Sequence, residues 1–514
     1  MARNKIMSAE AAARLIPDGA TVGTTGGGGG LLEADTLMGA VETRFLTTRS
    51  PRNLTIVHPL GLGDRDYRGL NHFAHEGLVK RVIGGHWVWS PRMQQLARDE
   101  KIEAYVLPGG VIMQLWREIA AKRPGLHTHV GLGTFVDPRQ DGGKMNRRAT
   151  EDVVELVRAD GRDLLRYKPF QVDVAILRGS VADPDGNISF DQEGATLDGL
   201  ALAMAAHNCG GKVLVQVRRV VDHGELPPRS VRIPGALVDA VVVEPNQPLS
   251  HEVFDDPSLT GEARGPDVPA AAPAFNARIA IARRAAEELH DDAVINYGFG
   301  IPDAVAKIVA QRGDSSRYYQ TIEHGTYGGT LLDGTSFGYA RNPAAMIDAP
   351  SQFDFYNGGG LDIAFLGMGE LDRFGHVNVS KLGGVTVGPG GFIDIAQNAR
   401  KVVFCGTFEA KGVVLSTGDG RLTIRHHGEV RKLVHQVDQI TFSGTQANLQ
   451  GQEVVYITER AVFRLTPEGL VLSEVAPGID VKADILDRMA FTPLAVDNAR
   501  VMDSRHFRDI DRKG

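Results

Sequence analysis

A glutamate beside several glycines is the residue whose surroundings best suit covalent chemistry. Glu323 follows a β-rich run, and glycines stand at 325, 328 and 329. A carboxylate at the end of a strand, with little side-chain bulk around it, is able to attack an electrophile such as a thioester. An exposed turn glutamate explains the same pattern, so the residues alone leave both interpretations open.

Two other glycine segments each follow a short strand and precede a predicted helix. They are Gly26–Gly30 and Gly298–Gly300, and Pro302 suits the first turn of the second helix. Glycine allows the main chain to approach a ligand closely, and the N–H groups at a helix start favour negative charge. Neither segment completes a GxGxxG or Walker pattern. A ligand loop and a purely structural turn therefore remain equal alternatives.

The elements that must position these segments alternate along the chain. Strands are predicted at 172–177 and 401–404, and a helix at 279–289. Alternation of this kind is typical of α/β layers. The two halves also repeat, because Asp173, Gly186 and Lys212 each have a counterpart 189 positions later. We therefore predict a duplicated α/β fold.

The N-terminal copy is the longer of the two. Gly26 to Asp173 spans 147 positions, whereas Gly298 to Asp362 spans 64. Between the halves, residues 244–274 contain six of the 25 prolines, a composition that interrupts regular structure. The sequence therefore predicts an N-terminal domain at 1–243 with a larger insertion, a linker at 244–274 and a C-terminal domain at 275–514.

Composition excludes several classes of protein. The formal charge is −7 with both signs interspersed, which offers no basic surface for nucleic acid. No apolar run approaches the ~20 residues that span a bilayer, and the N-terminus lacks the apolar core of a secretory signal. Cys209 and Cys405 form no metal or disulfide pattern, and the adjacent His426 and His427 read as a solvated loop. We expect a cytoplasmic enzyme without a metal or membrane segment.

The chain resembles the family I CoA-transferases through motifs spread along its length. Residues 322–329, around Glu323, resemble the nucleophile motif of that family, and residues 388–399 resemble its second glycine signature. Other segments resemble its propionate and acetate CoA-transferase branch, a branch of short-chain fatty acid metabolism; they are 72–87, 131–139, 352–362, 402–408 and 474–480. The resemblance implies two homologous α/β domains of the CoA-transferase type, fused in a single chain.

The resemblance also implies a ping-pong mechanism and roles for particular residues. Glu323 would carry CoA as a glutamyl thioester, and the Gly391 N–H would stabilise the oxyanion. Acyl-CoA and carboxylic acids would be the substrates, with no separate cofactor, in a homo-oligomer. Contacts with CoA would come from Gly298, Gly300, Asn378, Gly390 and Lys411. Lys411 fits a phosphate contact and a solvated surface lysine equally well, and His324 fits a packing role better than that of a base.

Two positions depart from the family pattern. Gly109 stands where relatives carry a glutamine that donates to the oxyanion, and Glu33-Ala34-Asp35 stands near their His-Pro-Glu. Losing one such donor typically costs on the order of 10²–10³ in rate. We expect an acyl specificity altered from propionate or acetate, toward a larger acid that uses the space at Gly109. On this expectation, Gly109→Gln would raise activity on short acyl groups.

Two alternative functions use the same residues. An acyl-CoA hydrolase would admit water to the glutamyl thioester, so that thiol release would need no acceptor acid. A CoA-binding or assembly subunit without catalytic activity would resemble the acyl-carrier transferase chains of lyases and decarboxylases. Intact Glu323 and Gly391 argue against the second alternative, and Gly109 argues for it.

Overall fold

The structure is a computed structural model that describes residues 4–266 and 275–509. These residues form two compact units. The first comprises the described residues of Met1–Pro266, Ile322–Asp354 and Gly383–Asp394; the second comprises those of Asp267–Thr321, Phe355–Leu382 and Ile395–Gly514. Packing units and sequence domains divide the chain differently, so the bounds 1–243, 244–274 and 275–514 stay a prediction. Part of the predicted linker, 267–274, lies outside the described residues.

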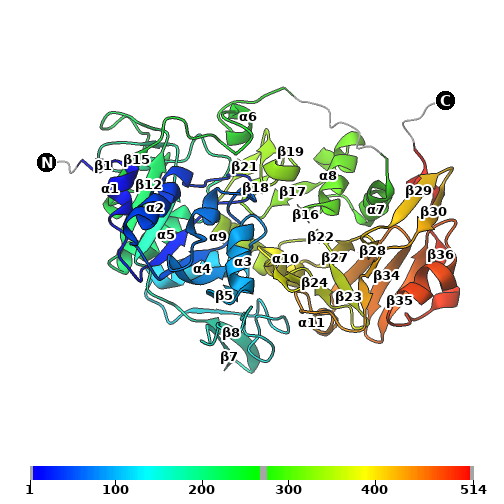
Figure 1. The fold of residues 1–514 in the computed structure, drawn as a ribbon. Helices are drawn as coiled ribbons and strands as arrows, with labels where there is room; N and C mark the ends of the chain where they lie inside the picture. Colours follow the sequence, from blue (N-terminus) through cyan, green and yellow to red (C-terminus); the bar gives the residue numbers. More distant parts are fainter. Residues whose placement is uncertain (1–3, 267–274, 510–514) are drawn as a thin grey trace. The chain divides into compact units, whose positions relative to one another are not determined.

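The first unit is built on one long sheet (Figure 1). Its strand order is β1-β15-β12-β9-β2-β3-β4-β5, and adjacent strands pair in parallel. The strands are β1 (Ile6–Met7), β2 (Thr21–Thr24), β3 (Leu54–His58), β4 (Val79–Gly84), β5 (Glu103–Val106), β9 (Val174–Arg178), β12 (Lys212–Val217) and β15 (Ala240–Val243). Every residue of β9 is buried, as expected for a parallel strand covered on both faces.

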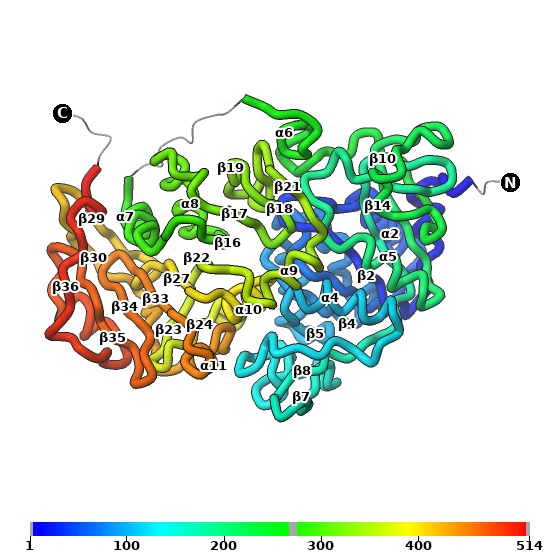
Figure 2. The backbone as a smooth tube through the Cα atoms, turned by 180° about the vertical axis from the view of Figure 1, so that it is seen from behind, coloured from blue at the N-terminus to red at the C-terminus, as the bar shows by residue number. Residues whose placement is uncertain are grey.

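Helices alternate with these strands along the chain. They are α1 (Ala9–Ala13), α2 (Asp35–Thr48), α3 (Pro91–Arg98), α4 (Gly109–Ala120) and α5 (Gly199–Asn208). Helix α1 packs on α2, and α4 packs on α5, which lies against β9 and β12. A small antiparallel sheet, β6 (Leu126–Thr128), β8 (Arg162–Tyr167) and β7 (Val154–Ala159), extends from this unit below β5 in Figures 1 and 2. Strands β4 to β8 occupy the predicted N-terminal insertion.

The second unit contains a parallel sheet that continues into antiparallel strands. Its strands run in the order β17-β16-β22-β27-β33-β34-β35-β36 (Figure 2). The pairs from β17 to β33 are parallel, those from β33 to β35 are antiparallel, and β36 pairs in parallel with β35. They are β16 (Val294–Tyr297), β17 (Tyr319–Ile322), β22 (Ile363–Gly367), β27 (Lys401–Cys405), β33 (Glu453–Ile457), β34 (Ala461–Thr466), β35 (Gly469–Val475) and β36 (Arg500–Val501). Helices α7 (Ala277–Ala285) and α8 (Ile301–Gln311) pack on each other.

The structure shows the predicted internal repeat. Strand β9 pairs with β2 and β12 as β22 pairs with β16 and β27, and both β9 with β22 and β12 with β27 start 189 residues apart. After each central strand, an aspartate accepts two main-chain N–H groups of the same kind of turn: Asp183 from Asp185 and Asn187, and Asp372 from Phe374 and His376. The α/β fold class and the duplication are confirmed.

Candidate active site

Glu323 lies in a tight turn directly after β17. The N–H of Gly325 donates to the Ile322 carbonyl over 3.0 Å and closes the turn. Gly325 has φ +101°, and a Cβ there would lie 2.1 Å from the Ile347 carbonyl oxygen, so only glycine fits. The turn therefore holds a half-buried carboxylate at the carboxyl end of a parallel strand, where α/β proteins commonly bind ligands.

His324, the next residue, is directed into the protein. Its side chain is buried, its ring stacks edge-on against Phe337 at 6.4 Å, and its Nδ1 lies 3.5 Å from the Gly338 carbonyl oxygen. This is the environment of a residue that packs beneath the Glu323 turn.

The second glycine segment precedes α10 (Phe392–Asn398) and is held by main-chain hydrogen bonds. The N–H of Gly390 donates to the Gly85 carbonyl over 2.8 Å, and the Gly390 carbonyl accepts the N–H of Gly109 over 2.7 Å. In the part of the chain that the structure describes, the N–H of the buried Gly391 donates to no acceptor. A buried N–H without a partner is the kind of group that stabilises a developing oxyanion.

Gly109 begins α4 and lies close to the main chain of two other segments. A Cβ on Gly109 would lie 2.9 Å from the Pro59 carbonyl oxygen and 3.0 Å from the Gly390 carbonyl carbon. Both atoms belong to the main chain and cannot rotate away. A side chain at position 109 would therefore press on neighbouring backbone, which argues against free space at that point, and the expected preference for a larger acyl group stays a prediction.

The main-chain N–H groups that open α4 are also engaged. Gly109 donates to Gly390, as described above, and Gly110 donates to the Asp394 carboxylate over 3.1 Å. These two N–H groups therefore cannot replace the side-chain donor that Gly109 lacks.

The first glycine turn packs against an indole. A Cβ on Gly28 would overlap the Trp89 ring at 2.1 Å, and one on Gly61 would lie 2.6 Å from both Trp89 Cδ1 and His86 Nδ1. The Arg65 guanidinium lies over the Trp89 ring, 4.5 Å from the ring centroid. The glycines are therefore required because two large rings, those of Trp89 and His86, lie against them.

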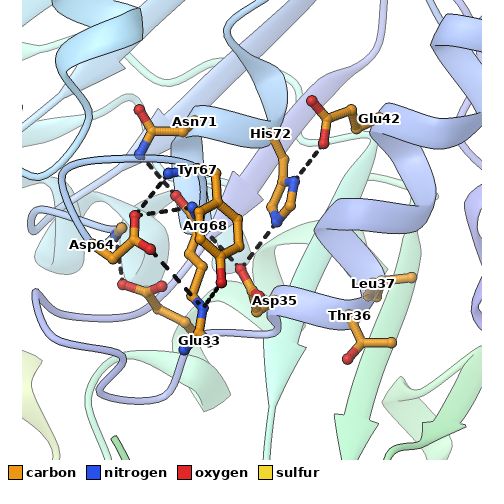
Figure 3. A network of polar contacts seen from close by, with 12 residues as sticks. Glu33, Asp35, Thr36, Leu37, Glu42, Asp64, Tyr67, Arg68, Asn71 and His72 are labelled. Atoms are coloured by element: carbon orange, nitrogen blue, oxygen red, sulfur yellow. Dashed lines mark hydrogen bonds and ion pairs between the residues drawn. The ribbon is translucent and has the colours of Figure 1, made fainter. Parts of the chain in front are cut away.

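Glu33 and Asp35, which belong to the segment that departs from the family pattern, take part in a polar network around the start of α2 (Figure 3). Glu33 accepts the Gly63 N–H over 2.7 Å, and Asp35 accepts the Gly69 N–H over 2.9 Å and lies 3.1 Å from His72 Nε2. His72 Nδ1 in turn lies 2.6 Å from Glu42. The network ties residues 63–72 to α2.

The charges of this network follow from burial and pairing. Burial raises the pKa of Glu33, although His251 Nε2 at 3.4 Å opposes the rise. Burial also acts against the charged form of His72, but the Asp35 and Glu42 carboxylates outweigh it and raise the His72 pKa. Glu33, Asp35, Arg68 and His251 line a polar cavity of about 620 Å³.

The predicted CoA contacts, Gly390 excepted, lie in the second unit. Gly298 donates its N–H to the Phe365 carbonyl over 2.8 Å, and Gly300, with φ +97°, caps α8 with open space at its Cβ position. Pro302 lies in the first turn of α8, as predicted. This turn exposes Phe299 at the carboxyl end of β16.

Asn378 and Lys411 differ sharply in exposure. Asn378 is fully buried, and its amide group donates to Glu370 and to the Lys381 carbonyl while accepting from Ser380 and Lys381. Lys411 is exposed, and among residues 4–266 and 275–509 it has no ion-pair partner. The amide of Asn378 thus holds its own turn, and CoA contacts at both positions stay a prediction.

The structure assembles only part of the predicted site in one unit. Glu323, Gly109, Gly390 and Gly391 belong to the first unit, whereas Gly298, Gly300, Asn378 and Lys411 belong to the second. His86 and Trp89 were not predicted as site residues. The sequence contains one indirect signal for these two residues, the glycines at 28, 61, 388 and 390. Glycines suggest that a bulky group lies close by, but the sequence does not identify that group.

Two classes of site are absent from the described residues. No group of three His, Cys, Asp or Glu side chains there is arranged to hold a metal ion. Within the same residues, no helix has the length and apolar character needed to cross a membrane.

Comparison with known proteins identifies the family. The model of the coenzyme A transferase family matches residues 5–244. Acetate CoA-transferase YdiF of Escherichia coli (strain K12) is 44% identical over 99% of this chain and 96% of its own length. Caffeate CoA-transferase of Acetobacterium woodii is 45% identical over 98% of this chain and 97% of its own.

Solved structures give the same answer. The apoenzyme of acyl-CoA transferase YdiF from Escherichia coli O157:H7 superimposes with a TM-score of 0.94 at 43% identity, covering 99% of this chain and 97% of that one. A thioester complex of that enzyme with CoA matches equally well, with a TM-score of 0.94. The chain therefore belongs to the coenzyme A transferase family. Its likeness over nearly its whole length to single-chain acetate and caffeate CoA-transferases confirms the predicted enzyme class and fold type.

Proposed function

We propose that the protein moves CoA between an acyl-CoA and a free carboxylic acid, with the Glu323 carboxylate as the nucleophile. A carboxylate oxygen attacks the thioester carbon, the C–S bond breaks, and a mixed anhydride and CoA thiolate form. The thiolate then attacks the glutamyl carbonyl, which releases the donor acid and leaves CoA on Glu323 as a thioester. An acceptor carboxylate reverses both steps, so no proton or phosphate is consumed.

The observation that carries this proposal is the Glu323 turn. It holds a half-buried carboxylate at a strand end, in the same compact unit as the N–H of Gly391, which has no acceptor among the described residues. A nucleophile and an oxyanion donor are the two groups that acyl transfer requires of the protein. The thioester complex known for the 43% identical enzyme of Escherichia coli supports the same covalent state here.

We also infer an acyl specificity that differs from acetate. The relatives at 44% and 45% identity are named for acetate and caffeate, acids of very different size, so identity alone selects neither. Trp89 lies on Gly28 and Gly61 and places an aromatic face beside the first glycine turn. Apolar contact with an indole favours an acyl group larger than acetyl. Comparing kcat/KM for acetyl-, butyryl- and cinnamoyl-CoA tests this directly, and a preference for acetyl-CoA would contradict it.

Two properties of the active form belong to the same proposal. By family resemblance, the enzyme acts in the cytoplasm and as a homo-oligomer. Light scattering of the purified chain measures the mass, and a monomer at working concentration would contradict the second part.

Trapping the intermediate tests the proposed function. The enzyme is mixed with acyl-CoA without an acceptor acid, reduced with borohydride and digested, and the peptides are weighed. Reduction is expected only on the peptide that carries Glu323, and Glu323→Ala should abolish it while lowering transfer by roughly 10⁴ or more. Glu76→Gln, at an exposed glutamate of the same unit, is the matched control and should change neither.

Label on another side chain, or transfer without any label, would overturn the proposal. Measuring thiol release with and without acceptor acid separates transfer from hydrolysis. Release without acceptor at the rate of transfer would assign the chain to the hydrolases instead.

A further inference from the structure

If Glu323 is the nucleophile, the oxyanion needs a second donor that Gly109 does not supply. Gly109 has no side chain, and the N–H groups of Gly109 and Gly110 are both engaged. The inference below therefore rests on the proposed function and concerns the group that takes this place.

The segment after β4 lies directly beside the second glycine signature. The Gly85 carbonyl accepts the N–H of Gly390, and the N–H of Trp87 donates to the Val387 carbonyl, each over 2.8 Å. His86 stands between these two bonds. Its main chain is therefore fixed against the segment that contains Gly391, and all of these residues belong to the first unit.

Glycines surround His86 on several sides. Its Cα lies 3.0 Å, and its Cβ 3.8 Å, from the positions that a Cβ would take on Gly388 and Gly390 respectively. Its Nδ1 lies 2.6 Å from the Cβ position of Gly61. An alanine at Gly61 would collide with the histidine ring, and one at Gly388 would collide with the Gly85 carbonyl and press on the His86 Cα, so both positions beside His86 require glycine.

The ring nitrogens of His86 are open to a ligand. In residues 4–266 and 275–509, neither nitrogen takes part in a hydrogen bond or ion pair, and the residue is half-buried. Neither nitrogen of His86 is among the fully buried polar atoms that lack a partner, so the ring can bond a ligand that enters from solvent. The fully buried His58, by contrast, donates its Nδ1–H to the Leu60 carbonyl over 2.7 Å.

The electrostatics keep this imidazole neutral. Burial first, and then the charges of His58 and Arg65, lower the pKa of His86 to about 4. At neutral pH the ring therefore presents one N–H donor and one lone pair, and it adds no positive charge that would hold a carboxylate substrate too tightly.

We propose that the ring N–H of His86 is the second hydrogen-bond donor to the acyl oxygen during attack by Glu323, together with the main-chain N–H of Gly391. The oxygen gains negative charge as the tetrahedral centre forms, and both donors strengthen their hydrogen bonds to it at that stage. No proton is transferred, since the oxygen returns to a carbonyl when the C–S bond breaks. His86 acts as a fixed dipole and not as a base.

Kinetics of His86 variants test this role. We expect His86→Ala to lower kcat for CoA transfer by about 10²–10³, with little change in KM for acyl-CoA. His86→Asn and His86→Gln keep a neutral donor and should recover to within about tenfold of wild type. His127→Ala, at an exposed histidine on β6, is the matched control and should retain wild-type rates. Melting curves identify any variant that fails to fold.

A second variant moves the ring without removing it. Gly61→Ala would push against His86 Nδ1 and Trp89, so it should reduce kcat as well. Gly39→Ala in α2 is its control, because the nearest side-chain atoms to the added Cβ lie at 3.5 Å, an ordinary contact.

The pH dependence separates a donor from a base. A neutral donor leaves the pH profile of kcat between 6 and 9 unchanged in shape when His86 is removed, whereas loss of a base would remove one limb. Loss of a limb would overturn the proposal. So would wild-type kcat in His86→Ala, or amide variants as slow as the alanine variant.

Borohydride trapping keeps the two proposals apart. If wild-type enzyme is not labelled on Glu323, the proposed function fails whatever His86 does. If wild-type enzyme is labelled, and His86→Ala labels at the same single-turnover rate, only the His86 proposal fails. Labelling that slows in step with kcat supports both.

Discussion

The N–H of Gly109 donates to the Gly390 carbonyl over 2.7 Å, so the start of α4 is bonded directly to the second glycine signature. This contact fixes both segments at the distance of a main-chain hydrogen bond. A side chain at 109 would have to fit between them, beside the Pro59 carbonyl. The glycine is therefore part of the local backbone packing and not simply a lost glutamine.

Gly109→Gln should reduce activity rather than restore it. The new Cβ would lie 2.9 Å from one main-chain atom and 3.0 Å from another, and such overpacking typically costs about 1–3 kcal/mol. We expect a lower melting temperature and a lower kcat on acetyl-CoA, with Gly39→Ala as the unaffected control. A gain of activity on short acyl groups would restore the interpretation based on sequence.

Two adjacent glycines should respond differently to the same change. A Cβ on Gly28 would lie 2.1 Å from the Trp89 indole, whereas the atoms nearest to a Cβ on Gly27 belong to the Leu31 side chain and lie at 3.3 Å or more. We expect Gly28→Ala to displace Trp89. The ratios of kcat/KM among acetyl-, butyryl- and cinnamoyl-CoA should then change by about tenfold, enough to alter their order. Gly27→Ala should keep the wild-type order. Equal effects of the two variants would show that Trp89 does not shape the acyl site.

Local sequence patterns predicted much of this architecture. Buried β-branched runs such as Val174–Arg178 and Lys401–Cys405 form strands wherever both faces are covered, and the shared spacing of 189 residues revealed the duplication. The Glu323 turn was also predictable, because Gly325 adopts a φ that strongly favours glycine.

Contacts between distant segments were not predictable from one sequence. The fit of Gly109 depends on the backbone of Pro59 and Gly390, which no periodic pattern connects. The position of His86 likewise depends on bonds from its neighbours to Val387 and Gly390. A half-buried histidine looks the same in the sequence whether it packs or binds, and the sequence does not show that the ring nitrogens of His86 lack a partner among the described residues.

His72 should stabilise the first unit mainly at low pH. Asp35 and Glu42 raise its pKa against the effect of burial, so its stabilising charge is fully present below the unfolded pKa of ~6.5. That contribution is lost as pH rises through the higher folded pKa. His72→Gln should therefore lower the free energy of unfolding in urea by about 1.5–3 kcal/mol at pH 6, and by less at pH 9.

The control for His72 is the exposed His127 on β6. His127→Gln should leave the urea midpoint unchanged at both pH values. An equal loss for His72→Gln at pH 6 and pH 9 would mean that the ring contributes through packing alone.

Asp198 should make the protein less stable as pH rises from about 4 to 6. Its buried carboxylate precedes α5, accepts the Trp116 Nε1–H over 2.9 Å and bonds the Thr25 hydroxyl of the first glycine turn. Burial raises its pKa to about 6, although the bonds to Thr25, to its own N–H and to Trp116 oppose the rise. The folded state thus holds a proton that the unfolded chain has released, and the associated stability is lost through that interval.

Asp198→Asn should remove this pH dependence. The Thr25 hydroxyl and the Trp116 indole both donate to the Asp198 side chain, and the oxygen of an asparagine amide can accept both bonds without carrying charge, so the variant mimics the neutral form. We expect the difference in unfolding free energy, variant minus wild type, to increase by roughly 2–3 kcal/mol between pH 4 and pH 7, because the pKa of about 6 exceeds its ordinary value by about two units. Urea titrations at pH 4, 5, 6 and 7 measure it, and a difference that stays constant would show that Asp198 is ionised throughout.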